Sequence, residues 1–108
     1  MSQILMPADI LALQKHSAEA AGLLKQLGNQ KRLMIMCSLI GTELSVGALN
    51  QMTDLSQSAL SQHLASLRSA GLVQTRREAQ TIYYSLCGDH AMQVIKVLQS
   101  IYCPELEA

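Results

Sequence analysis

The stretch from Leu55 to Gly71 constrains the fold more than any other part of this chain. Leu60, Leu64 and Leu67 recur at the i, i+4 and i+7 spacing of one face of an α-helix. Ser56 is a suitable N-cap, and Gly71 is the residue type that ends helices in the left-handed conformation. The pattern predicts an amphipathic helix over about residues 56–70.

The outward face of this predicted helix is small, uncharged and rich in hydrogen-bonding groups. At roughly 100° per residue, this face carries Ser58, Gln62, Ala65 and Ser69, with Ser61 and Gln57 beside them. No acidic residue occurs between Leu55 and Arg77, so nothing on this face would repel phosphates. Ser and Gln fit a DNA major groove, where Gln pairs with adenine. Taken alone, such a face is more often only solvated surface, so its neighbours must decide.

The preceding segment favours the DNA-binding alternative. Ser45 is a suitable N-cap for a short helix over Val46–Met52, and the turn 53–55 separates this helix from the next. Two short helices joined by a tight turn, the second with a polar outward face, form a helix-turn-helix. We therefore expect the outward face of the second helix to face DNA.

After Gly71 the apolar pattern changes to that of a β-hairpin, or wing, over residues 72–86. The runs 72–77 and 81–86 are rich in β-forming residues, and residues 77–80 would form the loop. Arg76 and Arg77 near the tip are predicted to reach DNA phosphates or a minor groove, although two such arginines could instead be a solvated strand edge. The predicted backbone contacts are Ser45, Ser56, Arg68, Arg76 and Arg77.

Three further helices complete a mainly α-helical, winged helix-turn-helix fold. Asp9 could cap a helix over 9–27, a strongly apolar helix over 30–40 would lie in the core, and the last helix would span 89–102. The apolar arc of the last helix, about 160°, is broad for a small domain. We therefore expect a homodimer through helices 9–27 and 89–102, with two recognition helices ~34 Å apart on a palindromic operator.

Composition limits the remaining possibilities. The 108 residues suit a single domain over 1–108, and the net charge of +0 weighs against binding nucleic acid through bulk charge. No stretch approaches the ~20 apolar residues of a membrane span, which predicts a cytoplasmic protein without membrane contact. No paired carboxylates, phosphate loop or activated thiol indicates an enzyme, and no cofactor is expected.

The run Leu55-Ser-Gln-Ser-Ala-Leu-Ser-Gln-His-Leu-Ala-Ser-Leu-Arg-Ser-Ala-Gly-Leu-Val73 resembles the ArsR/SmtB family of bacterial winged-helix repressors, as does the order of five helices with a hairpin before the last. The resemblance covers about Ala18 to Cys103. It implies a homodimeric regulator, repressor or antirepressor, whose affinity for double-stranded operator DNA changes with an inducer. The family's pattern implies that the groove-facing residues that contact bases are Gln57, Ser58, Ser61 and Gln62. By the same pattern, His63 supports the helix instead of touching bases.

The resemblance also implies which metal sites are absent. Family members with a thiolate metal site carry Cys-x-Cys where this chain has Ser45-Val46-Gly47. In the last helix, Asp89, His90 and Glu105 remain as possible ligands but form no complete family set, so no metal site is predicted. Zinc or nickel sensing is the alternative reading of the inducer.

The cysteines resemble those of the HlyU, BigR and SqrR subgroup, which also shares the wing sequence Glu78-Ala-Gln-Thr-Ile-Tyr-Tyr84. The resemblance implies that Cys37 and Cys103 form a dithiol switch that responds to reactive sulfur species or oxidants and lowers DNA affinity. Inert, buried thiols are the alternative, since free Cys usually behaves as a small apolar residue. Cys87 has no counterpart in the subgroup's pair.

Overall fold

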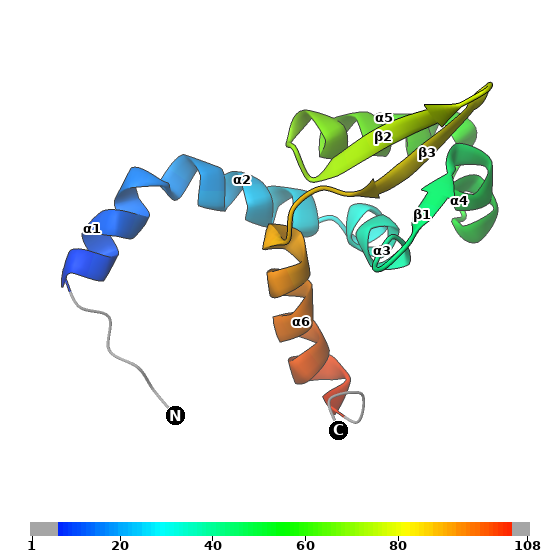
Figure 1. Cartoon of the computed structure of the whole chain (residues 1–108). Coiled ribbons are helices and arrows are strands. Elements are labelled where there is room, and N and C mark those ends of the chain that lie inside the picture. Colours follow the sequence, from blue (N-terminus) through cyan, green and yellow to red (C-terminus); the bar gives the residue numbers. More distant parts are fainter. Residues whose placement is uncertain (1–6, 105–108) are drawn as a thin grey trace.

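A computed structural model describes residues 7–104 of the chain and confirms the mainly helical winged helix-turn-helix fold (Figure 1). The elements follow in the order α1 (Pro7–Lys15), α2 (Ser17–Leu27), α3 (Gln30–Ser38), β1 (Glu43–Ser45), α4 (Val46–Met52), α5 (Gln57–Ser69), β2 (Val73–Glu78), β3 (Thr81–Leu86) and α6 (His90–Tyr102). Helices α4 and α5 form the helix-turn-helix, and β2 and β3 form the wing.

The core lies beneath α5 and is built around α3. Leu60, Leu64 and Leu67 are at most 1% exposed, as their spacing predicts. They pack in one cluster with Ile35 and Met36 of α3. Each buried side chain of this size contributes about 1.5–3 kcal/mol relative to an exposed one. The polar face of α5 therefore points away from the core, because the leucine stripe fixes the rotation of the helix.

The N-terminal helix departs from the prediction of one helix over 9–27. It is interrupted at His16, whose φ of −113° and ψ of 18° are not helical, and Asp9 lies inside the first turn of α1 instead of capping it. None of the residues of α1 is buried, so no packing within the protomer enforces a continuous helix. Helix α3 is also shorter than predicted and ends at Ser38.

The sheet contains a strand that the sequence did not predict. Residues Glu43–Ser45 form β1, which pairs antiparallel with β3, so the strand order is β1-β3-β2. The hairpin turn is also tighter than the predicted loop over 77–80, because Glu78 and Thr81 still pair. Only two residues remain in the turn, and Ala79 takes a positive φ of 56° to close it.

Helix α6 extends away from the sheet, and α1 lies at the opposite end of the molecule from the helix-turn-helix (Figure 1). Only Ala91 and Ile95 of α6 are buried, whereas Val97, Ile101 and Tyr102 are 56–76% exposed. Helix α1 likewise exposes Ile10, Leu11 and Leu13. Two apolar helix faces are thus uncovered within one protomer. None of the helices between residues 7 and 104 is both long and apolar enough to cross a membrane.

Candidate nucleic-acid interface

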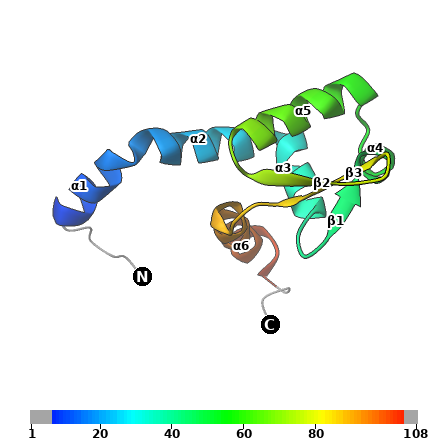
Figure 2. The same cartoon turned by 45° about the horizontal axis from the view of Figure 1, so that its top comes forward.

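Helix α5 lies along the outside of the domain (Figure 2). Its polar face comprises Gln57, Ser58, Ser61 and Gln62, all of them exposed. The whole helix contains no acidic residue, and its one arginine, Arg68, is exposed in the last turn. His63 is half-buried at the edge of the core. The structure therefore brings the four predicted base-contacting residues onto one surface without a competing carboxylate.

Serine side chains fix where both helices of the helix-turn-helix begin. Ser45 Oγ accepts a hydrogen bond from the backbone N–H of Ala48, and Ser56 Oγ accepts one from the backbone N–H of Ala59, each at 3.1 Å. Both serines are thus confirmed as N-caps. Ser56 is exposed and Ser45 half-buried, and each hydroxyl retains a proton that it can donate to a phosphate oxygen.

The turn between α4 and α5 is held by a side chain that the sequence reading did not single out. Asn50 Nδ2 donates a hydrogen bond of 3.1 Å to the backbone carbonyl oxygen of Leu55. This contact joins the last turn of α4 to the residue before the α5 N-cap. Together with the buried leucines, it fixes α5 relative to α4, so the polar face does not depend on a mobile loop.

The two wing arginines have different surroundings. Both are exposed, but Arg76 donates hydrogen bonds to the carboxylates of Glu43 and Glu78 and stacks on the ring of Tyr83, 4.6 Å from its centroid. The Arg76 hydrogen bond holds the pKa of Glu43 below its usual value. Arg77 points to the other face of the strand, because successive strand residues alternate. Contact of either arginine with phosphate stays a prediction.

The three cysteines are free thiols in three different environments. Cys37 lies near the end of α3, half-buried against the core, and this burial raises the pKa of its thiol. Cys103 is half-buried at the C-cap of α6, where its backbone N–H donates to the carbonyl oxygen of Gln99 at 2.7 Å. Cys87 is exposed just after β3. The role predicted for Cys37 and Cys103 stays a prediction.

The candidate metal ligands do not form a cluster in the described part of the chain. Asp89 precedes α6 and His90 begins it, whereas Glu105 lies outside the described residues. Within residues 7–104, no three His, Cys, Asp or Glu side chains gather closely enough to hold a metal ion.

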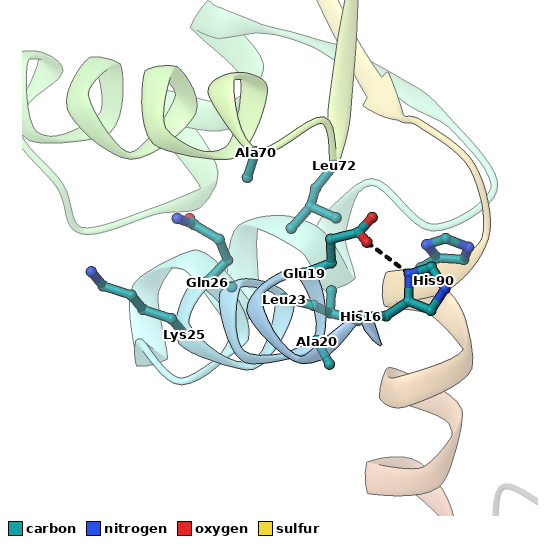
Figure 3. Close-up of a pocket in the computed structure, with 10 residues that line it drawn as sticks. His16, Glu19, Ala20, Leu23, Lys25, Gln26, Ala70, Leu72 and His90 are labelled. Atoms are coloured by element: carbon teal, nitrogen blue, oxygen red, sulfur yellow. Dashed lines mark hydrogen bonds and ion pairs between the residues drawn. The ribbon is translucent and has the colours of Figure 1, made fainter. Parts of the chain in front are cut away.

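A hollow on the surface lies between α2, the start of α6 and the corner that joins α5 to β2 (Figure 3). It measures about 660 Å³, and Leu23 and Leu72 contribute to its apolar lining. At its rim, the His16 Nδ1 atom lies 2.8 Å from Glu19 Oε1. The hollow adjoins the uncovered helices and is separate from the polar face of α5.

Comparison with known proteins agrees with this arrangement. Residues 29–75 match the model of the family described as bacterial regulatory protein, arsR family. The chain is 50% identical over 97 residues to the transcriptional activator HlyU of Vibrio cholerae, covering 90% of each chain.

Two solved structures extend the comparison. The transcriptional repressor BigR from Xylella fastidiosa superposes with a TM-score of 0.81 at 39% identity, covering 92% of this chain and 98% of BigR. The homodimeric winged helix-turn-helix domain of a possible ArsR-family regulator from Mycobacterium bovis gives a TM-score of 0.72 at 28% identity, covering 99% and 94%. The chain therefore belongs to the ArsR/SmtB family of winged-helix transcriptional regulators, in the branch that contains HlyU and BigR.

Proposed function

We propose that this regulator binds a palindromic operator as a homodimer and reads base edges with the polar face of α5. The observation that carries the proposal is that Gln57, Ser58, Ser61 and Gln62 are all exposed on a capped helix without acidic residues. A Gln amide pairs bidentately with adenine, and a Ser hydroxyl donates to bases or phosphates.

The uncovered apolar faces of α1 and α6 support the homodimer. Ile10, Leu11, Val97 and Ile101 are 46–60% exposed in the protomer, and their burial against a second copy removes this apolar surface from water. The related Mycobacterium bovis domain is homodimeric. If the two-fold axis of the dimer lies at these helices, both α5 helices stay available to bind DNA. They would then fit two half-sites about one DNA turn, ~34 Å, apart.

Contacts to the DNA backbone are proposed for two exposed arginines and for the two N-cap serines around the polar face. Arg68 in the last turn of α5 and Arg77 on the wing supply positive charge, and the N-cap residues Ser45 and Ser56 supply hydroxyl groups. Such contacts set the orientation of the protein on the duplex but carry no sequence information. Their loss should lower affinity for all sequences alike.

The experiment that tests base reading is operator binding by Gln62→Ala. The variant should lose about 1–3 kcal/mol of discrimination at one base pair of each half-site. Gln30→Ala is the matched control, because Gln30 is an exposed glutamine at the start of α3, away from the polar face. Wild-type affinity and sequence preference in Gln62→Ala would remove Gln62 from the base contacts.

We further propose that Cys37 and Cys103 form a dithiol switch that lowers operator affinity in response to reactive sulfur species or oxidants. Because burial raises the pKa of Cys37, less of this thiol is ionised at neutral pH, and we propose that Cys103 reacts first. The Cys103 thiolate takes the sulfane sulfur of a persulfide, whose thiol leaves. Cys37 then attacks the inner sulfur of the Cys103 persulfide, a disulfide forms and hydrogen sulfide leaves.

The switch is tested by operator binding before and after treatment with a sulfane-sulfur donor, with peptide mapping of the same samples. Treatment should lower affinity about tenfold or more, equivalent to ~1.4 kcal/mol, and link Cys37 to Cys103 within one chain. Cys37→Ser and Cys103→Ser should not respond, whereas Cys87→Ser, which removes the exposed thiol, should respond like wild type. Affinity that ignores sulfur but follows added zinc or a chelator would favour metal sensing.

A further inference from the structure

We propose that Arg76 is a positioning residue that locks the wing to the helix-turn-helix, and that it supports DNA binding through this lock instead of contacting phosphate. The inference rests on the proposed function of α5 and the wing. It concerns one cluster, the wing clasp, which consists of Glu43 on β1, Arg76 and Glu78 on β2, and Tyr83 on β3.

The guanidinium of Arg76 reaches across the full width of the sheet. Its Nε donates to both carboxylate oxygens of Glu43 at 3.2 Å, and its Nη2 donates to Glu43 Oε1 at 2.5 Å. Its Nη1 donates to Glu78 Oε1 at 2.6 Å. Because β3 lies between β1 and β2, the contact to Glu43 spans two strand spacings of about 4.8 Å each. Every nitrogen of the guanidinium thus has a carboxylate partner.

The register of the sheet explains why these side chains meet. Arg76 pairs with Tyr83, and Tyr83 pairs with Ser45, so the three residues form one row across the sheet. Glu43 lies two residues before Ser45 and therefore on the same face. The Tyr83 ring lies beneath the guanidinium and stabilises it by a cation–π contact. The clasp is therefore built into the pairing of all three strands.

The clasp links the wing to α4 because β1 runs directly into that helix. Ser45, the last residue of β1, is the N-cap of α4. The ladder between β1 and β3 is only three residues long, so the bidentate side-chain link adds a further connection to its few backbone hydrogen bonds. Holding Arg76 on Glu43 therefore fixes the position of the wing relative to the polar face of α5.

The charges around Arg76 argue against a direct phosphate contact. Two carboxylates surround one guanidinium, so the clasp carries a net charge of −1 and adds no positive potential. A phosphate would have to displace Glu43 or Glu78. Arg77 offers the contrast, because it lies on the opposite strand face and makes no ion pair within the described part of the chain.

Glu43→Gln and Glu78→Gln form a matched pair that tests the clasp. Each removes one carboxylate from the same guanidinium, so each lowers the long-range repulsion of DNA by one charge. Only Glu43→Gln weakens the link to β1, because it removes the charge and one of the two acceptor oxygens that Arg76 binds there. Operator affinity of Glu43→Gln should be about two- to fivefold lower than that of Glu78→Gln. Equal affinities, or tighter binding by Glu43→Gln, would overturn the proposal.

The salt dependence of operator binding distinguishes Arg76 from Arg77. Arg77→Ala should reduce the slope of log affinity against log salt by about 0.9 per protomer, as expected for one lost phosphate contact. Arg76→Gln should lower operator affinity but leave the salt slope at its wild-type value. The double variant Glu43→Arg with Arg76→Glu, which exchanges the two charges, should restore most of the operator affinity. A slope reduced by Arg76→Gln as much as by Arg77→Ala would refute the clasp.

Failure of the clasp and failure of the proposed DNA surface give different results. Amide hydrogen exchange of β1 and β3 in the free protein measures the clasp without DNA. It should be faster in Glu43→Gln than in Glu78→Gln, and equal protection would refute the lock. Unchanged operator binding by Gln62→Ala and Arg77→Ala would instead refute the proposed DNA surface.

Discussion

Ser56 is proposed to act twice, as the N-cap of α5 and as a contact to the DNA backbone, and two substitutions separate these roles. In Ser56→Ala, the backbone N–H of Ala59 loses its partner at 3.1 Å. Because Ser56 is exposed, no core packing is lost, and the cost is that of the cap, about 1 kcal/mol. For a domain of about this size, this corresponds to a decrease of about 4–8 °C in Tm.

Ser56→Asp should keep the cap, because Asp is as good an N-cap as Ser and its charge favours the helix N-terminus. Its Tm should therefore stay near that of wild type. The carboxylate would, however, face a phosphate if Ser56 contacts the DNA backbone, so operator affinity should fall below that of Ser56→Ala. Stability and affinity thus move in opposite directions between the two variants.

The assays are thermal unfolding by circular dichroism at one fixed protein concentration, because dimerisation makes Tm concentration-dependent, and operator binding by fluorescence anisotropy. Ser69→Ala is the control, since Ser69 is exposed at the other end of α5 and should change stability by less than about 0.5 kcal/mol. An unchanged Tm in Ser56→Ala would refute the cap. Wild-type affinity in Ser56→Asp would refute the backbone contact.

Further predictions concern the core, the thiols and the dimer. Leu64→Ala, at a position 1% exposed, should lower the free energy of unfolding by about 2–5 kcal/mol in denaturant titrations, and a loss below about 1 kcal/mol would contradict its place in the core. Burial raises the pKa of the Cys37 thiol from 9.0, so the folded protein favours the neutral form of this thiol. The free energy of unfolding should therefore decrease as pH rises above about 9. This part of the decrease should be absent in Cys37→Ser. At pH 8, mass spectrometry should also show slower alkylation of Cys37 than of the exposed Cys87, and equal rates would contradict its burial. Ile101→Asp, at a position 59% exposed in the protomer, should raise the dimer dissociation constant more than about tenfold in analytical ultracentrifugation, whereas an unchanged value would place the dimer contact elsewhere.

The sequence predicted α5 well because its signals are local and agree with one another. The leucine spacing sets the buried face, and Ser56 marks the start of the helix. The rotation of the polar face follows directly from these two features. The short helix α4 was predicted for the same reason, with Ser45 as its cap.

The elements that the sequence did not predict depend on contacts between distant residues. Strand β1 is three residues long, too short for an alternating pattern, and it exists because β3 pairs with it. The partner of Arg76 is Glu43, 33 residues earlier in the chain. The break at His16 was not predicted because the apolar pattern continues on both sides of it. The helix is interrupted there in the structure, and no residue of α1 is buried.

The most direct test of base reading by α5 is an NMR titration of the 15N-labelled protein with operator DNA. We expect the largest shifts of backbone amide and Gln side-chain signals at Gln57, Ser58, Ser61 and Gln62, with smaller shifts at the wing tip. Unperturbed signals for these four residues, with the main shifts at α1, α2 or α6, would contradict this expectation and place the DNA on another face.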